Sequence, residues 1–573
     1  MDDDLHKVRH SAAHVTAQAV KRLWPKTRLA IGPPIDEGYY YDVEPEHPLT
    51  EEDLPKIEQE IEKIIRANHP FQQSWMTKPE AEKFFSGRDE RFKLEIIREI
   101  PDSKVSIFTD GDFVDLCEGP HVASTGDLKA VKLLSLAGAY WRGKETNPQL
   151  TRIYGTAFHR KEELEQFLAA REEAKKRDHR KLGVALKLFT VLEEAGAGLV
   201  FYLPRGAQLR QTIEEYSRQE HARRGYVPVL TPHLLRSNIW VRSGHYEHYK
   251  PNMFIFKTED EQEWGVKPMN CPGHILIYRA GLHSYRELPL RLFELGTVYR
   301  NEKSGVLHGL LRVRGFTQDD AHIFCRVNQL EQEIGGVLEF IQQVFRDFGF
   351  SEYRVEMSTR PPEFMGNAEQ WSRAEEILLA VLKAKGIPYE VSPGAGAFYG
   401  PKIDVHVKDT LGRYWQCATA QLDFVLPQRF GLRYVEQDGK EAAPVMIHRA
   451  IFGSLERFIG TLIEHHGGAF PLWLAPVQVA VIPISEGEES YAVQVTAAVA
   501  AAGLRAECDS RKETLQARIR DAQLEKVPYM LVVGKREAQG LQVAVRARKE
   551  GDLGAMALEE FLGRARREIE EKR

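Results

Sequence analysis

The stretches RLFELGTVYRNE, residues 291–302, and HGLLRVRGFTQDDAHIF, residues 308–324, decide how the largest part of this chain folds. The first carries the aromatic and β-branched residues that favour a strand. Two later runs, YWQCATAQLDF at 414–424 and APVMIHRAIFG at 443–453, have the same character. Segments with helical composition, such as residues 206–225, separate these runs. We therefore expect a mostly antiparallel sheet with flanking helices over residues 182–474.

The rest of the chain divides around this block. A chain of 573 residues is too long for one hydrophobic core, because domains hold about 150 residues each. Residues 1–158 combine a first helix, from Leu5 to Leu23, with short strand-like runs, which indicates an α+β unit. Residues 159–181 are dense in charge and in helix formers, as in a solvated linker helix. Residues 475–573 alternate strands with helices and predict a small α/β domain.

Composition limits the class of protein. Hydrophobic residues make up 43% and charged residues 28% of the chain, as in ordinary globular proteins. No apolar run reaches the ~18 residues of a membrane helix, and the acidic start lacks the apolar stretch of a secretory signal. Five cysteines in so long a chain are no disulfide framework. We expect a cytoplasmic protein without a membrane partner.

Net charge gives no indication of a nucleic-acid partner, because it is −5. Residues 505–549, however, hold eleven Lys/Arg against six Asp/Glu, a local surplus of five. A basic surplus of this kind fits either a phosphate-backbone footprint or a solvated face. Both interpretations stay open on charge alone.

Three residues of the large block have the chemistry of zinc ligands: Cys271, His322 and His448. Three protein ligands leave a fourth position for substrate, which is the arrangement of a catalytic metal site. They lie far apart in the sequence, so spacing alone equally allows plain core packing.

A second set lies near the N-terminus. His10 and His14, in HSAAH, stand four residues apart on the expected first helix and so share a face. Cys117 and His121, in CEGPH, complete four ligand-type residues. A zinc site, a metal-free pocket in which imidazoles carry protons and a purely structural cluster all fit this spacing.

Longer motifs connect these sets to a known family. The opening two stretches resemble motif 2 of class II aminoacyl-tRNA synthetases in its threonyl form, HRAIFGSLERFIG resembles motif 3, and VPVLTPHLL with Pro232 resembles motif 1. PMNCPGH, AFYGPKIDV and WQCATAQLDF are also typical of threonyl-tRNA synthetases. The resemblance covers essentially the whole chain. It implies a multidomain α+β and α/β fold: an editing domain (1–158), a linker helix (159–181), a class II catalytic domain (182–474) and an anticodon-binding domain (475–573).

The resemblance also implies roles in the catalytic domain. Zn²⁺ is expected at Cys271, His322 and His448, and Mg²⁺ is expected with ATP. Arg300, Arg457, Lys402 and His245 match catalytic positions, the last a proposed base for the terminal ribose. ATP contacts are expected from Arg300, Glu302, Arg312, Phe316, Gln416, Thr419, Ser454 and Arg457, and threonine contacts from Met269, Asp320, Tyr399 and Gln421.

In the outer domains the resemblance implies editing and anticodon recognition. His10, His14, Lys93, Asp115, Cys117 and His121 match editing positions, and Glu537 and Arg546 match anticodon-reading positions. The implied activity is ATP-dependent ligation of L-threonine to tRNA(Thr) through a threonyl-adenylate, with hydrolysis of mischarged seryl-tRNA(Thr). The implied partners are tRNA(Thr), L-threonine, ATP and a second copy of the chain in a homodimer.

The chain departs from the family pattern in places. Many bacterial relatives carry a small β-grasp domain before HSAAH, which the given sequence does not include; either the natural protein lacks this domain or the sequence has been shortened. Glu118 stands where the family usually has arginine, and RKETLQARIR lacks the usual glycine after the lysine. Two alternatives remain: a prolyl or glycyl synthetase, which would lack the triad and HSAAH, and a silent paralogue that only binds tRNA. The second would usually have lost an ATP arginine or a zinc ligand.

Overall fold

The computed structural model describes residues 3–572 of the chain, so that Met1, Asp2 and Arg573 lie outside the described part. Two compact units are present, Met1–Glu172 and Glu173–Arg573. Helix α5 (Lys161–Arg177) runs from the first into the second, where the sequence predicts a linker helix, and α6 (His179–Ala185) follows it. None of the described helices is long and apolar enough to cross a membrane.

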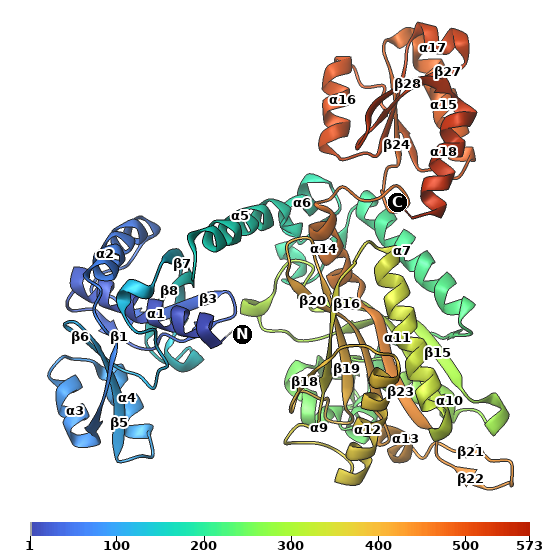
Figure 1. Ribbon diagram of the computed structural model, residues 1–573. Helices are drawn as coiled ribbons and strands as arrows, with labels where there is room; N and C mark the ends of the chain where they lie inside the picture. The colour runs from blue at the N-terminus through green and yellow to red at the C-terminus, as the bar shows by residue number, and fades with distance from the viewer. Residues whose placement is uncertain (1–2, 573) are drawn as a thin grey trace. The chain divides into compact units, whose positions relative to one another are not determined.

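An eight-stranded sheet forms the centre of the second unit (Figure 1). Its pairs are antiparallel apart from the parallel pairs β11–β15 and β17–β18 at its two edges. The order across the sheet is β11 (Val227–Pro228), β15 (Leu290–Tyr299), β16 (Gly315–Cys325), β23 (Val445–Ser454), β20 (Tyr414–Asp423), β19 (Lys402–Lys408), β17 (Tyr353–Ser358), β18 (Glu390–Ser392). The predicted antiparallel sheet is confirmed.

Register across the central strands places the site. His322 on β16 lies opposite His448 on β23, and His448 lies opposite Gln421 on β20. Because side chains alternate between the two faces of a strand, Ile323 and Ile447 point into the main hydrophobic core. The three polar side chains therefore form one row on the opposite face.

Helices cover the apolar face of this sheet, chiefly α7 (Pro204–Arg223), α11 (Leu330–Asp347), α12 (Ala368–Ala384) and α14 (Leu455–His466). Helix α14 begins where Ser454 Oγ accepts a hydrogen bond from the Arg457 N–H group, an N-cap. It ends at Gly467, whose left-handed φ of 57° terminates the helix. The cap places Arg457 in the first turn, next to the end of β23.

The C-terminal part forms a separate five-stranded sheet in the order β25 (Ala506–Cys508), β24 (Val479–Pro483), β26 (Tyr529–Val533), β27 (Gln542–Ala547), β28 (Gly551–Ala557). The first three strands are parallel and the last two pair antiparallel. Helices α15 (Glu489–Ala501), α16 (Leu515–Leu524), α17 (Lys535–Gly540) and α18 (Leu558–Glu570) complete it (Figure 1). This is the mixed α/β domain that the alternating pattern predicts.

The first unit is α+β, as expected. Helix α1 (Asp3–Leu23) is buried along residues 11–20. It packs on a sheet of β1 (Arg28–Leu29), β3 (Gly38–Glu44), β8 (Gln149–Phe158) and β7 (Ala130–Tyr140), to which β2 (Pro34–Ile35) adds. A second sheet holds β4 (Gln72–Thr77), β5 (Lys104–Asp110) and β6 (Phe113–Leu116), and α3 (Lys78–Ser86) and α4 (Arg91–Glu99) pack on it. Helix α2 (Leu54–Ala67) packs instead on α1.

Gly453, at the end of β23, generates a stability prediction. Its φ is +74°, and an added Cβ would lie 2.4 Å from the Cys417 carbonyl oxygen. We expect Gly453→Ala to lower the free energy of unfolding by about 2 kcal/mol or more, from backbone strain plus a clash with main chain. Chemical denaturation measures this.

Gly439→Ala is the matched control. Gly439 has a φ of +82°, and nothing lies within 4 Å of an added Cβ. Gly439→Ala should lower the free energy of unfolding by only about 1 kcal/mol, the penalty for a left-handed backbone at a residue with a Cβ. Equal losses in the two variants would show that contact with Cys417 does not constrain this turn.

Candidate active site

One cavity of about 600 Å³ in the second unit collects nearly all the residues predicted for the catalytic domain. It lies on the polar face of the large sheet, with walls from β16, β19, β20, β23 and α14. Its lining includes Met269, Cys271, Arg300, Glu302, Arg312, Phe316, Asp320, His322, Tyr399, Lys402, Gln416, Thr419, Gln421, His448, Ser454 and Arg457. Of the residues predicted for this domain, only His245 does not line the cavity.

The three metal-type residues meet at one end of the cavity. His322 comes from β16, His448 from β23, and Cys271 is the first residue of α10 (Cys271–Arg279). One ligand atom from each lies within 4.8 Å of the others, and all three side chains are buried. Burial raises the pKa of the Cys271 thiol and lowers the pKa of His322, so both favour the neutral form without a cation.

Neighbouring groups determine which ring nitrogens face the triad. His322 Nδ1 lies 2.8 Å from His274 Nδ1, and His274 Nε2 lies 3.0 Å from Glu294 Oε2. His448 Nε2 lies 3.0 Å from Asp423 Oδ2. These contacts leave His322 Nε2 and His448 Nδ1, 3.1 Å apart, as the free ligand atoms.

The Glu294 carboxylate is stable in this position. Burial would raise its pKa, but hydrogen bonds from His274 and Lys267 lower it to about 2. Lys267 Nζ lies 3.0 Å from Glu294 Oε1, and both side chains are almost fully buried. Sequence reasoning missed these supporting residues. The one available signal was that His274 and Lys267 flank Cys271 within and beside PMNCPGH.

Cationic side chains line the same cavity. Arg457 donates to the Leu311 carbonyl oxygen at 3.3 Å, and Arg312 pairs with Glu302 at 3.0 Å. The Arg300 guanidinium carbon lies 5.0 Å from the centre of the Phe316 ring. Planar cations around an aromatic wall suit a nucleotide with phosphates.

A carboxylate that the sequence reasoning missed organises the strands beside them. Asp404 on β19 accepts hydrogen bonds from Gln416 at 2.6 Å and Thr419 at 2.9 Å, both on β20. It also pairs with Lys402. The side chains predicted to contact ATP and the reacting carboxylate thus share one anchor.

His245 lies beneath the cavity rather than in its wall. It begins α9 (His245–Tyr249), and its Nε2 lies 3.0 Å from Met269 Sδ and 3.8 Å from Cys271 Sγ. Complete burial lowers its pKa to about 3. The neutral imidazole has the protonation state of a base, but it reaches the cavity only past Met269 and Cys271.

The first unit contains the second histidine cluster. His10 and His14 of α1 meet Cys117 and His121, with one ligand-type atom of each within 4.8 Å of the others. Cys117 Sγ lies 3.3 Å from both His10 Nε2 and His121 Nε2. Ser11, which the sequence analysis missed, lies 3.0 Å from His121 Nδ1.

A buried carboxylate connects this cluster to Lys93. Asp115 lies 3.1 Å from His14 Nδ1 and 2.5 Å from Lys93 Nζ, and it accepts a hydrogen bond from Tyr41 at 2.7 Å. Burial opposes charge on His14, but Asp115 and Cys117 raise its pKa to about 9. The structure therefore brings together all six residues predicted for editing, and Glu118 lies exposed beside them.

The two predicted anticodon residues lie on adjoining elements of the C-terminal sheet. Glu537 on α17 caps its own helix by accepting from the Gly534 N–H group at 2.9 Å. Arg546 on β27 lies 3.6 Å from Asp552 on β28. Both side chains are partly exposed.

Comparison with known proteins places each part of the chain. Residues 254–466 match the tRNA synthetase class II core domain (G, H, P, S and T), residues 478–568 an anticodon binding domain, and residues 105–154 the threonyl and alanyl tRNA synthetase second additional domain. The threonine–tRNA ligase of Oleidesulfovibrio alaskensis is 54% identical over 569 residues, which cover 99% of this chain and 88% of that protein. The ligase of Carboxydothermus hydrogenoformans is 52% identical over 573 residues, covering 100% and 90%.

The chain belongs to the threonine–tRNA ligase family. A solved structure described as the RNA binding domain of a threonyl-tRNA synthetase from Cryptosporidium parvum superposes with a TM-score of 0.66 at 42% identity, covering 68% of this chain and 98% of that one. A prolyl-tRNA synthetase from the same organism shares the fold alone, with a TM-score of 0.54 at 17% identity, covering 68% and 74%. The resemblance read from the motifs is confirmed.

The environment of Cys117 generates a pH prediction for a threonine–tRNA ligase of this sequence. Burial would raise the thiol pKa, but hydrogen bonds from His10, His121 and His14 lower it to about 3. The reactive thiolate is then fully populated above pH 5, so the rate of alkylation by iodoacetamide should stay nearly constant from pH 6 to 9. Mass spectrometry of the modified peptide measures this rate.

Cys508 supplies the internal control. It is partly exposed, and burial raises its pKa. Its alkylation should accelerate about tenfold per pH unit across the same range. A Cys117 rate that climbs in parallel with that of Cys508 would contradict the charged cluster.

Proposed function

We propose that the chain ligates L-threonine to tRNA(Thr) with ATP through a threonyl-adenylate, and hydrolyses mischarged seryl-tRNA(Thr) in its first unit. One observation carries the proposal: a Cys/His/His triad and a group of arginines converge on one cavity. The first suits an amino acid with a hydroxyl group, and the second suits a nucleotide triphosphate.

The arginines support adenylate formation. A carboxylate must attack the α-phosphorus of ATP, so two anions have to approach each other. Arg300 and Arg457 would neutralise this repulsion with their planar guanidinium groups. Lys402 would lie close to the carboxylate of the amino acid. Glu302 and Phe316 would contact adenine, and Arg312 and Arg457 would contact the γ-phosphate. Mg²⁺ would accompany the triphosphate, and further ATP contacts would come from Gln416, Thr419 and Ser454. Catalysis here is positioning and charge stabilisation.

Cys271, His322 and His448 would hold a zinc ion. The fit rests on the two ring nitrogens that the His274 and Asp423 contacts leave free beside the thiol. Zinc bound there would offer ligand positions for both the amino group and the side-chain hydroxyl of threonine. Valine has no hydroxyl and would lose that interaction. An apolar pocket alone would separate these two similarly shaped amino acids by only about 10²-fold. Met269, Asp320, Tyr399 and Gln421 would enclose the rest of the amino acid.

Pyrophosphate exchange tests the proposal. The purified chain should exchange pyrophosphate into ATP with threonine, and with valine it should be less efficient by more than the about 10²-fold that an apolar pocket alone provides. Asp423→Asn should weaken zinc binding about 10- to 100-fold, measured by chelator competition, because the carboxylate that contacts His448 Nε2 no longer orients the ring. Robust valine-dependent exchange, or active protein without zinc, would overturn this assignment.

The second reaction, hydrolysis of seryl-tRNA(Thr), is needed because serine resembles threonine closely. It has the hydroxyl of threonine and lacks one methyl group, which is worth roughly 1–3 kcal/mol in discrimination. Hydrolysis of seryl-tRNA at a separate site would make up the difference. We assign this to His10, His14, Lys93, Asp115, Cys117 and His121, whose imidazoles would position a water on the seryl ester without bound metal.

His14 gives this assignment a direct test. We expect His14→Ala to let seryl-tRNA(Thr) accumulate while threonylation keeps its rate, because His14 joins Asp115 to the thiolate and lies in the other unit. Deacylation of preformed seryl-tRNA measures the loss. Unchanged deacylation would refute the role, and His47→Ala, which touches only Trp24 among the described ring contacts, serves as the control.

The remaining parts of the proposal concern the homodimer, the anticodon contacts, the domain boundaries and the cellular compartment. The motif 1 segment exposes the apolar side chains of Val227, Leu230 and Leu234, which suits a homodimer interface. Glu537 and Arg546 would read anticodon bases by paired hydrogen bonds. We retain the division into 1–158, 159–181, 182–474 and 475–573, and a cytoplasmic setting for the five free cysteines.

A further inference from the structure

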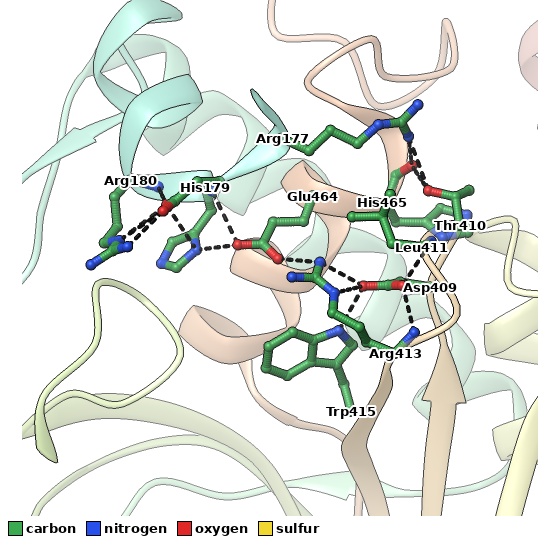
Figure 2. Close-up of polar contacts among 11 residues, drawn as sticks. Arg177, His179, Arg180, Asp409, Thr410, Leu411, Arg413, Trp415, Glu464 and His465 are labelled. Atoms are coloured by element: carbon green, nitrogen blue, oxygen red, sulfur yellow. Dashed lines mark hydrogen bonds and ion pairs between the residues drawn. The ribbon is translucent and has the colours of Figure 1, made fainter. Parts of the chain in front are cut away.

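A buried polar network joins the segment just after the linker helix to the core of the second unit (Figure 2). His179, the first residue of α6, lies at its centre and is fully buried. It faces Glu464 on α14, and Figure 2 shows the chain of contacts continuing from Glu464 through Arg413 to Asp409. None of these residues belongs to the site assigned above.

Both ring nitrogens of His179 are occupied. Nδ1 lies 2.7 Å from Glu464 Oε1, and Nε2 accepts a hydrogen bond from the Leu310 N–H group at 3.0 Å. A nitrogen that accepts from a backbone N–H carries no proton, so His179 must be the neutral tautomer that donates from Nδ1 to Glu464. The ring thus joins a carboxylate on α14 to the main chain of the 308–312 loop.

The carboxylate end of this connection is rigid. Glu464 also accepts from the His179 N–H group at 3.1 Å and from Arg413 at 2.5 Å. Burial would raise its pKa, but the His179 hydrogen bonds and the charge of Arg413 lower it. Asp409 in turn holds Arg413 at 2.8 Å and accepts from Trp415 at 2.9 Å. Glu464 therefore stays ionised and fixed.

At the other end of this connection, the 308–312 loop lies very close to the His179 ring and to α14. A Cβ on Gly309, whose φ is +49°, would lie 2.1 Å from His179 Nε2, and a Cβ on Gly460 would lie 3.1 Å from Leu310 Cβ. Two glycines thus allow the loop to lie against the imidazole and α14. From the other side Arg457 donates to the Leu311 carbonyl oxygen. The loop is held between His179 and Arg457, directly before Arg312.

Asp178, His179 and Glu464 also have ligand-type atoms within 4.8 Å of one another. A metal site does not follow, because both His179 nitrogens are used and Asp178 pairs with Arg180 at 2.6 Å. A positioning role accounts for every contact.

We propose that His179 is a positioning residue for the ATP site: it fixes the main chain at Leu310 so that Arg312 meets the triphosphate. The proposal rests on the function proposed above, and it places control of the nucleotide loop in the segment that follows the linker helix. Loss of the Leu310 hydrogen bond should weaken ATP binding and leave threonine binding unchanged, because none of the described hydrogen bonds joins residues 308–312 to Cys271, His322 or His448.

Two amide substitutions separate the two hydrogen bonds of the ring. The amide of His179→Asn reaches about as far as Nδ1 and keeps the bond to Glu464, whereas the amide oxygen of His179→Gln reaches about as far as Nε2 and accepts from Leu310. In pyrophosphate exchange we expect His179→Asn to raise the KM for ATP about tenfold with the KM for threonine unchanged. His179→Gln should stay within about twofold of the unaltered protein.

Hydrogen exchange of the loop supplies a readout that does not need activity. In His179→Asn the amides of residues 308–312 should exchange about tenfold faster, while those of α14 keep their protection. Equal KM for ATP in both variants, or equal loop protection, would overturn the proposal. An unaltered protein without threonine-dependent exchange would instead overturn the proposed function, and loop protection alone would then decide the role of His179.

Discussion

The pairing of β16 with β23 is the constraint on which the site depends. It sets His322 opposite His448 and, through β20, sets Gln421 in the same row. A slip of either strand by one residue would turn its imidazole into the apolar core. The ladder is protected against such a slip because Ile323 and Ile447, the neighbours of the two histidines, are fully buried on the other face. Hydrophobic burial thus fixes the register of the polar row.

Beneath this row the fold accepts buried charge. Arg449, next to His448, is almost fully buried and donates to the Asp319 carbonyl oxygen at 3.1 Å. Asp319 accepts from the Ile451 and Phe452 N–H groups at 2.9 and 3.0 Å. Groups of this kind add little net stability, because desolvation offsets their attraction, but removing one partner leaves an uncompensated charge. We interpret them as fixing the path of β23 between the triad and the glycine at its end.

The sheet and the lining of the cavity could be predicted from the sequence because continuous stretches of the chain carry the strand composition and the motifs. Strand composition identified β15, β20 and β23, and the motifs carried the cavity residues. What it could not supply were pairs that only tertiary structure brings together. Asp423 and Asp404 look like ordinary strand carboxylates, and nothing around His179 indicates a partner at Leu310, because contacts between distant segments leave no local signal.

The prediction for His245 shows a different limit. Its motif, SGHY, predicts a role at the terminal ribose, yet the ring packs against Met269 and Cys271 and does not line the cavity. A motif specifies which residues are close but not which side of a wall each one faces. That depends on the left-handed Gly244 that precedes α9, where an added Cβ would lie 2.7 Å from Met365 Sδ.

Two clusters of cysteine and histidine in one chain show how environment divides one set of residue types between two kinds of chemistry. In the first unit Asp115 and Lys93 supply fixed charges, so the Cys117 thiolate already has a protonated His14 as its counter-ion. A cation entering there would have to displace that proton. In the second unit burial and the nearby carboxylates Asp320 and Asp423 raise the pKa of the Cys271 thiol despite the charge of Arg300, and they keep the thiol neutral. A divalent ion would supply the missing positive charge, which is why we assign zinc to the buried triad and water-positioning imidazoles to the charged cluster.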